Sequence, residues 1–497
     1  MTELQSSYRQ IVKATSLFGG VQLFQIVISV IRSKFVAVLL GPAGMGIVGL
    51  LTASTGLVAG LTNFGLGTSA VKNISEANAS NDGDRVTIMI TVLRRLVWIT
   101  GFLGALLTLV FSPLLSQFTF GNKEYTLAFV WISITLLLNQ LSTGELVLLQ
   151  GLRRLQQLAK ANVYGSLTGL VVSIPLYYRF GVEGIVPVII ITAFATLFFT
   201  WYFTRNIYIK RLKVSRNTTI LEGKNMLVTG FMISMSGLIS LMVAYVIRIF
   251  INRTGDVTDV GYYTAGFTII NTYVGMIFTA MGTDYYPRLS LVSNDNKQCK
   301  MHINQQSEIA LLILAPILVG FLVFINWAVI LLYSSKFLTI THMVYWATLG
   351  IFFKALSWAI AFVFLAKGAG KLFFWNELAG SIHGLGLSLL GYHLAGLTGL
   401  GISFFATYLL YLIQVYVIAK IKYSFTFHHS LIRIFGIQFV LALSCFFVVN
   451  FISTPYSYLP GILLIVVSGW YSYKELEKRI GLKEIIQKSI IHRIKKK

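Results

Sequence analysis

The chain has 497 residues, of which 56% are hydrophobic and only 11% are charged, with a formal net charge of +23. A soluble protein of this size would need more charge to cover its surface, so the composition excludes a soluble globular protein. The positive charge indicates either nucleic-acid binding or an excess of cations in the cytoplasmic loops of a membrane protein. Long apolar runs recur along the chain and favour the second interpretation. We therefore expect an all-α polytopic membrane protein that binds no nucleic acid.

About fourteen apolar segments are each long enough to cross a bilayer, which takes roughly 20 helical residues. The first segment follows a polar N-terminus and leads directly into the second, which is typical of a first transmembrane helix and not of a cleaved signal peptide. The expected spans are residues 16–40, 45–70, 96–115, 126–150, 161–178, 184–204, 225–250, 261–282, 308–332, 342–366, 372–395, 399–419, 434–452 and 457–473.

The distribution of cations over the loops predicts the topology. If the N-terminus is placed inside, 32 of the 40 Lys and Arg residues fall in the inside segments, four in the outside loops and four within spans. Cytoplasmic loops of membrane proteins carry such an excess. We therefore expect both termini on the cytoplasmic side.

Three short matches relate the two halves of the chain. "VIRSKF" resembles "VIRIFI", Gly46 in "GMGIVG" corresponds to Gly261 in "DVGYYT", and "GLGT" corresponds to "AMGT", at offsets of 216, 215 and 215 residues. Six spans separate the equivalent helices, so the two halves have the same orientation. This pattern predicts two parallel six-helix lobes around a central cavity.

The chain is expected to have five parts. Residues 1–204 form an N-terminal six-helix lobe, residues 205–224 a cytoplasmic basic linker, and residues 225–420 a C-terminal six-helix lobe. Residues 421–473 form two extra transmembrane helices in a hairpin, and residues 474–497 form a basic amphipathic cytoplasmic tail. The tail has apolar residues that share one face, and its cations suit an anionic leaflet. Anchoring to membrane lipids is therefore favoured over the binding of a protein partner.

Four cations lie within the expected spans, where each costs roughly 2.5–3.5 kcal/mol and usually faces a cavity or a partner. They are Arg32, Lys34, Arg248 and Lys354. Polar stripes accompany two of them, as expected for helices that line a water-filled cavity. The stripes consist of Gln22, Gln25, Ser29 and Arg32 in the first span, and of Ser236, Ser240, Ala244 and Arg248 in the seventh.

Lys34 lies about 200° around the helix from Arg32 and close enough to the outer end to snorkel. The spacing therefore favours Arg32 for the cavity. Lys354 lies too deep in its span to reach the surface easily.

Few carboxylates lie within the spans to neutralise these cations. Glu145 and Glu377 are the clear cases, and Glu377 lies nearer the cytoplasmic surface than Lys354, so the two are not level. Two interpretations stay open: ion pairs that serve packing, and a cavity that holds an anion. The excess of cations favours the second. Because intramembrane acids are rare, Glu377, and after it Glu145, are also candidates for linkage to a proton or cation.

Motifs for nucleotide, metal and catalytic sites are incomplete. "KGAGK" lacks the first Gly and the Ser or Thr of a phosphate loop, and the adjacent His428 and His429 lack metal-ligand spacing. The outside loops have about thirteen residues or fewer, which leaves little room for a transferase or hydrolase site. We expect no cofactor, no metal and no enzymatic activity.

Several stretches resemble the Wzx-type flippases of bacterial polysaccharide assembly, in the multidrug/oligosaccharidyl-lipid/polysaccharide exporter superfamily. They are "KFVAVLLGPAGMGIVGL" with "NFGLGTSAVKNISEA", "GYYTAG" to "DYYPRLS", and "LGIFFKALSWAIAFVFLAKGAGKLFFWNE". The resemblance covers roughly residues 10–420 and is closest to the O-antigen and enterobacterial common antigen translocases. It places a family lysine at Lys34 and at Lys354 and an acid at Glu377, but does not clearly support Arg32. Family members commonly have twelve spans, so the last two helices are a departure.

The resemblance implies a flippase that moves undecaprenyl-diphosphate-linked oligosaccharide, such as an O-antigen repeat unit, across the bacterial inner membrane. Polysaccharide polymerase or chain-length machinery would then be partners. The physical interpretation agrees, because a diphosphate needs cations at mid-depth and the lobes could rock around a polar cavity. A drug/cation antiporter of the same superfamily and a polysaccharide polymerase stay open as alternatives. The first would need an acidic cavity, and the short outside loops disfavour the second.

Overall fold

The computed structural model describes residues 24–480, apart from residue 81, residues 208–211 and residue 213. Helices connected by short turns form the described part of the chain, which contains no strand. Contacts divide the chain into two compact units, residues 1–264 with 332–336 and residues 265–331 with 337–497. Gln22 and most of the expected tail lie outside the described residues. The lobe boundary expected at residues 205–224 stays a prediction.

The first unit begins with a helix over residues 24–39. It continues through α2 (Gly41–Thr62), α3 (Leu66–Ala79), α4 (Gly83–Val110), α5 (Ser112–Phe120), α6 (Thr126–Gly151), α7 (Leu155–Phe180), η1 (Gly181–Gly184), α8 (Ile185–Thr204), α9 (Arg216–Thr254) and the first part of α10 (Val257–Thr268). The span expected at 45–70 ends at Thr62, because Phe64 and Gly65 adopt positive φ angles of 47° and 63°. Glycine is required at position 65, since a Cβ there would collide with the carbonyl oxygen of Gly230 in α9.

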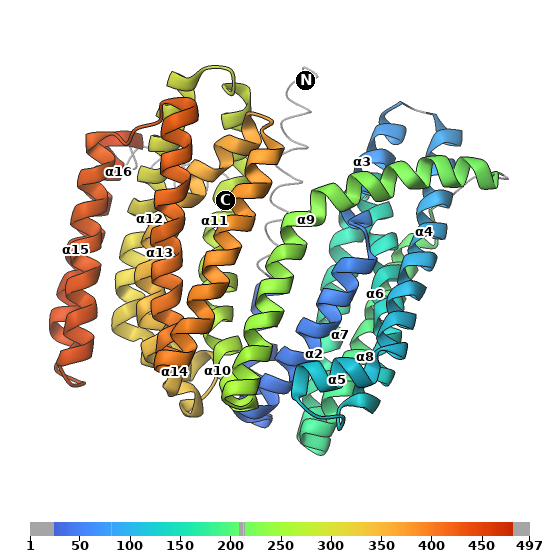
Figure 1. Ribbon diagram of the computed structural model, residues 1–497, viewed down its shortest axis with the longest axis horizontal. Coiled ribbons are helices and arrows are strands. Elements are labelled where there is room, and N and C mark those ends of the chain that lie inside the picture. Colours follow the sequence, from blue (N-terminus) through green and yellow to red (C-terminus); the bar gives the residue numbers. More distant parts are fainter. Residues whose placement is uncertain (1–23, 81, 208–211, 213, 481–497) are drawn as a thin grey trace, which may run out of the picture. The chain divides into compact units, whose positions relative to one another are not determined.

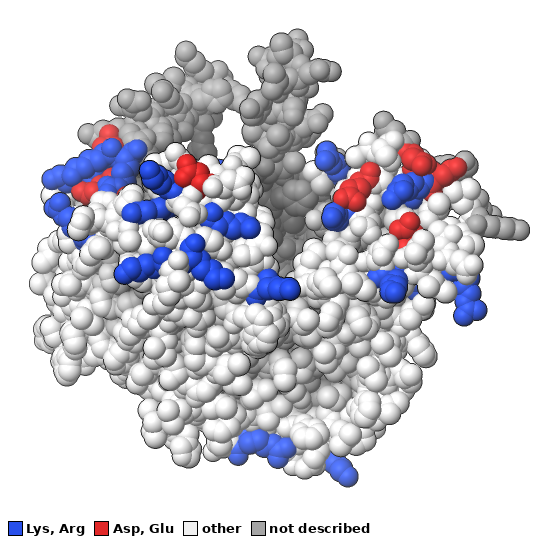
Figure 2. Space-filling model, turned by 45° about the horizontal axis from the view of Figure 1, so that its top comes forward, with Lys and Arg blue, Asp and Glu red and all other residues white. Residues whose placement is uncertain are grey.

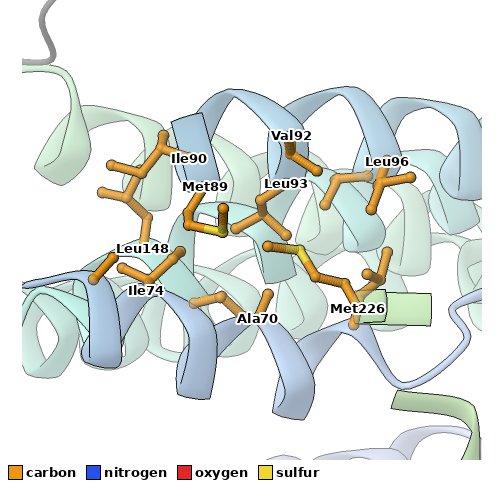
Figure 3. Close-up of a cluster of buried hydrophobic side chains, with 13 residues drawn as sticks. Ala70, Ile74, Met89, Ile90, Val92, Leu93, Leu96, Leu148 and Met226 are labelled. Carbon is orange, nitrogen blue, oxygen red and sulfur yellow. The ribbon is translucent and has the colours of Figure 1, made fainter. Parts of the chain in front are cut away.

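The first turns of α9 are held by a buried apolar cluster of the first unit. Figure 3 shows Met226 of α9 pointing among side chains from α3, α4 and α6, including Ala70, Leu93 and Leu148. Ser215 caps α9, its Oγ accepting from the Thr218 backbone N–H at 3.0 Å. Figure 1 shows α9, in green, crossing the ends of α3 and α4, which it contacts, before it bends along the unit. The expected linker 205–224 is thus helical from Arg216.

The contact between α2 and α10 supports the predicted repeat. A Cβ on Gly46 would collide with the carbonyl oxygen of Val257, and a Cβ on Gly261 would collide with that of Pro42. Each Cβ would also lie 3.0 Å from the other glycine's backbone nitrogen. Both residue pairs are 215 apart, the offset found in the sequence. A local two-fold axis between two helices produces such reciprocal contacts, because each residue then meets the equivalent of its own partner.

The second unit is built around α13, most of whose side chains are buried. Its elements are the rest of α10, the π-helical turn η2 (Ile269–Val274), α11 (Gly275–Leu291), α12 (Asn296–Leu332) up to residue 331, η3 (Ser335–Ile340) from residue 337, α13 (Thr341–Ala366), α14 (Gly370–Tyr423), α15 (His429–Phe451) and α16 (Tyr458–Ile480). Helix α14 folds back on itself at Ala395 and Gly396, whose φ angles are −141° and 54°. Its two arms, packed through Gly391 and Gly399, are the spans expected at 372–395 and 399–419.

The number of spans agrees with the expected fourteen. Among the described residues, ten helical segments are long and apolar enough to cross a membrane. Two of them, 155–204 and 370–423, turn back at η1 and at Gly396 and so contribute a second arm each. The helix over residues 24–39 and α16 are not among these ten segments, but they coincide with the first and last expected spans and bring the number of helical arms to fourteen. The chain is therefore a multi-pass, all-α membrane protein.

Charge is distributed unevenly along the helices. In each unit, most Lys and Arg side chains visible in Figure 2 gather at one end of the helices, and few lie at the opposite end. This sidedness is the pattern on which the topology prediction rests. The assignment of the charged end to the cytoplasm stays a prediction.

The two extra helices, α15 and α16, are bonded to the rest of the second unit by polar contacts. Glu308 of α12 is buried, and its Oε2 lies 2.8 Å from Nε of Arg479 in α16. Ser430 of α15 donates to the other oxygen of Glu308, and Nη1 of Arg479 lies 2.5 Å from Oε2 of Glu475. One buried carboxylate thus connects three helices.

Candidate substrate-binding site

Lys354 lies in the middle of α13 inside a cage of aromatic rings. Its Nζ is 5.1 Å from the ring centroid of Tyr408, 5.7 Å from that of Phe404 and 5.8 Å from that of Phe278. Cations within about 6 Å of a ring face are attracted by its quadrupole. The same Nζ donates to Oδ1 of Asn271 at 3.3 Å. Within the described part of the chain, no carboxylate lies within 4.0 Å of Lys354.

Several elements of the second unit build this cage. Phe404 and Tyr408 are one turn apart on the second arm of α14, with ring centroids 4.7 Å apart. Phe278 comes from α11, and Asn271 lies in η2, a π-helical turn of the kind often found at functional sites. The rings stabilise the ammonium without supplying an acceptor, and an ammonium has three donors. Lys354 therefore keeps donors for an incoming anion.

A hydrogen-bonded network surrounds Glu377 between the two arms of α14. Tyr411 donates to Oε1 of Glu377, and Asn376 Nδ2 donates to the same oxygen at 3.3 Å and to the Tyr411 hydroxyl at 2.9 Å. Gln414 Nε2 donates to Oδ1 of Asn376 at 2.8 Å, and its Oε1 lies 3.2 Å from Nε2 of His383. The network gives a partly buried carboxylate two hydrogen-bond donors, the Tyr411 hydroxyl and the Asn376 amide.

The Lys354 cage and the Glu377 network are adjacent on α14. Tyr408 of the cage and Tyr411 of the network have ring centroids 6.4 Å apart at 89°. Lys354 and Glu377 form no ion pair in the described part of the chain, so neither neutralises the other. Two charged groups of opposite sign are thus joined through two neighbouring tyrosines.

The other three candidate cations belong to the first unit. Arg248 lies 5.3 Å from the ring centroid of the buried Tyr263, and its Nη1 donates to the Ala244 carbonyl at 3.0 Å. Its Nε is buried and has no hydrogen-bond partner among the described residues. Arg32 is partly buried and interacts electrostatically with the hydroxyl of Tyr177 in α7. Lys34 is also partly buried.

The predicted polar lining is described only in part. Gln25 and Ser29 are partly buried in the first helix, whereas Gln22 lies outside the described residues. Ser240 is exposed, and its Oγ donates to the Ser236 carbonyl at 3.2 Å. These residues remain candidates for a polar surface beside the cations.

Glu145, the second acid singled out, has a local partner. Its Oε1 lies 3.5 Å from Nη2 of Arg94 in α4. The sequence did not indicate this pair, because Arg94 counts there as a loop residue. It also did not single out Tyr411, Asn376 or Gln414, because these residues come together with Glu377 only when α14 folds back.

Comparison with protein families gives one match. Residues 35–342, more than half of the chain, match a family described as "Polysaccharide biosynthesis protein". No curated protein matches the chain. The family match agrees with the resemblance to polysaccharide flippases indicated by the sequence.

Comparison with solved structures identifies the fold. The chain is similar to "Lipid II flippase MurJ, inward closed conformation" with a TM-score of 0.69 and 14% identity, over 94% of this chain and 99% of that one. It is also similar to an "inward-facing conformation of a multidrug resistance MATE family transporter of the MOP superfamily", with a TM-score of 0.68 and 16% identity, over 82% and 96%. At this identity the likeness concerns the fold, which is that of a membrane transporter.

Proposed function

The chain belongs to the polysaccharide biosynthesis protein family, and from this premise we propose that it flips a polyprenyl-diphosphate-linked oligosaccharide across a membrane. The finer assignment is undecaprenyl diphosphate carrying an O-antigen or related repeat unit, moved from the cytoplasmic to the outer face of the bacterial inner membrane. Both termini are placed in the cytoplasm in this proposal. The proposed interaction partners are membrane lipids and the polysaccharide polymerase or chain-length machinery.

The observation that carries the proposal is that no carboxylate of the described residues lies within 4.0 Å of Lys354. A buried cation is costly, and proteins usually offset that cost with a carboxylate. Here three rings and one amide oxygen surround the ammonium. Such a group can bind phosphate oxygens through charge-assisted hydrogen bonds without first breaking an ion pair. It would repel the cationic compounds that a drug/cation antiporter carries, so the cage favours the flippase.

The remaining candidates receive proposed roles around this group. Arg32, Lys34 and Arg248 are proposed to bind the diphosphate at other stages of its passage. Gln25, Ser29 and Ser240 are proposed to contact the sugar, as is Gln22. The polyprenyl tail can stay in lipid throughout, so the protein needs to shield only the polar head.

Glu377 is proposed to link transport to a proton or cation. Its network contains a carboxylate, a phenol, two amides and an imidazole, which together can accept a proton or surround a small cation. Glu145 is the second candidate, and its pairing with Arg94 makes it the less favoured of the two.

Transport of a fluorescent undecaprenyl-diphosphate disaccharide into proteoliposomes tests the proposal. Lys354→Arg should keep most activity, whereas Lys354→Gln should lose about tenfold, the effect of one charge-assisted contact. Lys371→Gln is the matched control, because Lys371 is exposed at the start of α14. Normal transport by Lys354→Gln at a normal membrane level would refute the role of Lys354. Transport of a cationic dye in place of the disaccharide would identify the antiporter instead.

A further inference from the structure

A cavity of about 490 Å³ lies between α4, α6 and α8 in the first unit, and none of the four candidate cations of the transport site lines it. Aromatic side chains line it and remain largely exposed: Trp98 by 57%, Phe194 by 61% and Trp201 by 51%. Large apolar side chains exposed on transmembrane helices contact lipid. The cavity therefore opens toward the bilayer.

Arg94 and Glu145 give this apolar cavity two charges with unused bonding capacity. The side chain of Arg94 is 48% exposed, and its Nη2 lies 3.5 Å from Oε1 of Glu145, its one carboxylate contact among the described residues. The other oxygen, Oε2, is buried and has no hydrogen-bond partner among the described residues. A carboxylate oxygen without a donor is costly. The Glu145 side chain lines the cavity and is 16% exposed, so a donor from outside the chain can reach this carboxylate with a small rotation of the group. One ligand that carries both an anion and a donor would satisfy both groups.

The cavity lies at the depth of lipid headgroups. Arg95, which follows Arg94, donates to Oγ1 of Thr219 at 2.5 Å, and Thr219 lies in the polar first turn of α9. Trp98 is one turn beyond Arg94, and Trp201 lies one turn before the charged end of α8. Tryptophan is enriched where the hydrocarbon meets the headgroups. The two charges thus face the layer of phosphates and not the centre of the bilayer.

We propose that this cavity binds a phospholipid whose headgroup carries a primary ammonium, phosphatidylethanolamine. Its phosphate would lie on Arg94, its ammonium would donate to Oε2 of Glu145, and the beginning of an acyl chain would cover Phe194 and Trp98. A choline headgroup has the same charge but no N–H, so it cannot satisfy the carboxylate. A purely anionic headgroup would place its charge beside that carboxylate. The inference is independent of the transported substrate.

Native mass spectrometry of the purified protein with defined lipids tests this proposal. Palmitoyl-oleoyl phosphatidylethanolamine should be retained about tenfold better than the phosphatidylcholine of the same chains, the effect of one charge-assisted hydrogen bond. The N-monomethyl and N,N-dimethyl headgroups should be retained progressively less well. This series uses the unaltered protein, so it does not depend on the folding of a variant. Equal retention of the ethanolamine and choline lipids would refute the proposal.

Two variants assign the preference to the cavity. Glu145→Gln should abolish discrimination between the ethanolamine and choline headgroups, and Arg94→Gln should weaken the binding of both lipids. Lys160→Gln, which alters an exposed cation on α7 outside the cavity, should change neither. Discrimination that persists in Glu145→Gln would place the lipid elsewhere and overturn the assignment.

Discussion

Two partly buried cations of the second unit have opposite surroundings. Arg479 has two carboxylate partners, Glu308 at 2.8 Å and Glu475 at 2.5 Å, and so connects α16 to α12. Lys354 has no carboxylate partner among the described residues, and aromatic rings with one amide oxygen surround it. The paired charge is bonded to carboxylates within the protein through Nε and Nη1. The unpaired one keeps donors that no described carboxylate uses, and this difference is the basis for the proposal that Arg479 is structural and that Lys354 binds an anion.

Removal of the paired cation should have the largest effect on stability. Arg479→Gln leaves the carboxylate of Glu308, whose side chain is only 9% exposed, without its cation. Breaking a buried pair costs roughly 3–5 kcal/mol, and the partial exposure of Arg479 reduces this to about 2–3 kcal/mol. Thermal unfolding in detergent should show a clear decrease in Tm. The double variant Glu308→Gln/Arg479→Gln should recover part of it, because no uncompensated charge remains.

Lys478→Gln is the matched control for this experiment. Lys478 also contacts Glu475, at 2.9 Å, but its side chain is 59% exposed. An exposed pair contributes less than about 1 kcal/mol, so its loss should barely change Tm. If Arg479→Gln were as stable as Lys478→Gln, the paired cation would not be structural and the contrast with Lys354 would fail.

Charge reversal at the unpaired cation should have the largest effect on transport. Lys354→Asp places a negative charge against three ring faces and an incoming diphosphate, so transport should fall about a hundredfold, or roughly 2.7 kcal/mol. Stability is measured on Lys354→Gln, which adds no charge and should keep its Tm, since no buried acid loses a partner. Transport and Tm are measured on the same preparations, with the Asp and Gln variants of Lys371 as the controls. A large drop in Tm for Lys354→Gln would mean that Lys354 serves packing.

The sequence predicted the helices and the rare charges well, for a physical reason. Apolar length decides which segments cross a bilayer, and a charge inside such a segment stands out against a hydrophobic background. Lys354 and Glu377 were visible in this way. The surroundings of Lys354 were not, because Phe278, Phe404 and Tyr408 look like ordinary membrane residues. They meet only after α11, α13 and the folded-back α14 pack together.

The internal repeat was also predicted only in part, because the sequence shows which residues are equivalent but not which residues are in contact. Three matches at offsets of 215 or 216 residues predicted that Gly46 and Gly261 are equivalent, and nothing in the pattern predicted that they touch. Their contact needs the backbones of α2 and α10 to approach more closely than any Cβ allows. Glu308 was missed because the expected span starts at that residue, whereas α12 begins at Asn296 and carries it inside the helix.

Glu377 offers an intermediate case, a carboxylate whose neighbours donate hydrogen bonds but carry no positive charge. Glu377→Gln keeps an oxygen that can accept from Tyr411 and Asn376, so the network should persist. The variant cannot release a proton, and we expect gradient-driven transport to fall about tenfold, to the level seen without a gradient. The measurement is uptake into proteoliposomes with and without an imposed proton or sodium gradient.

Glu145→Gln is the companion variant, because Glu145 is the second acid proposed for coupling. If Glu377→Gln retained the full response to the gradient and Glu145→Gln lost it, the roles of the two acids would be exchanged. If both variants retained it, neither acid would provide the linkage.

The smallest expected effect concerns the ring nearest to Lys354. Tyr408→Leu removes a cation–π contact of roughly 0.5–1 kcal/mol, so the ammonium should be held less firmly and the apparent KM should rise about threefold with little change in kcat. Tyr408→Phe keeps the ring and should behave like the unaltered protein. The Tyr408 ring also touches Tyr411 of the Glu377 network. If Tyr408→Leu reduced the response to an ion gradient as well, the cage and the network would act as one coupled unit. If it changed KM alone, the ring would only position the cation.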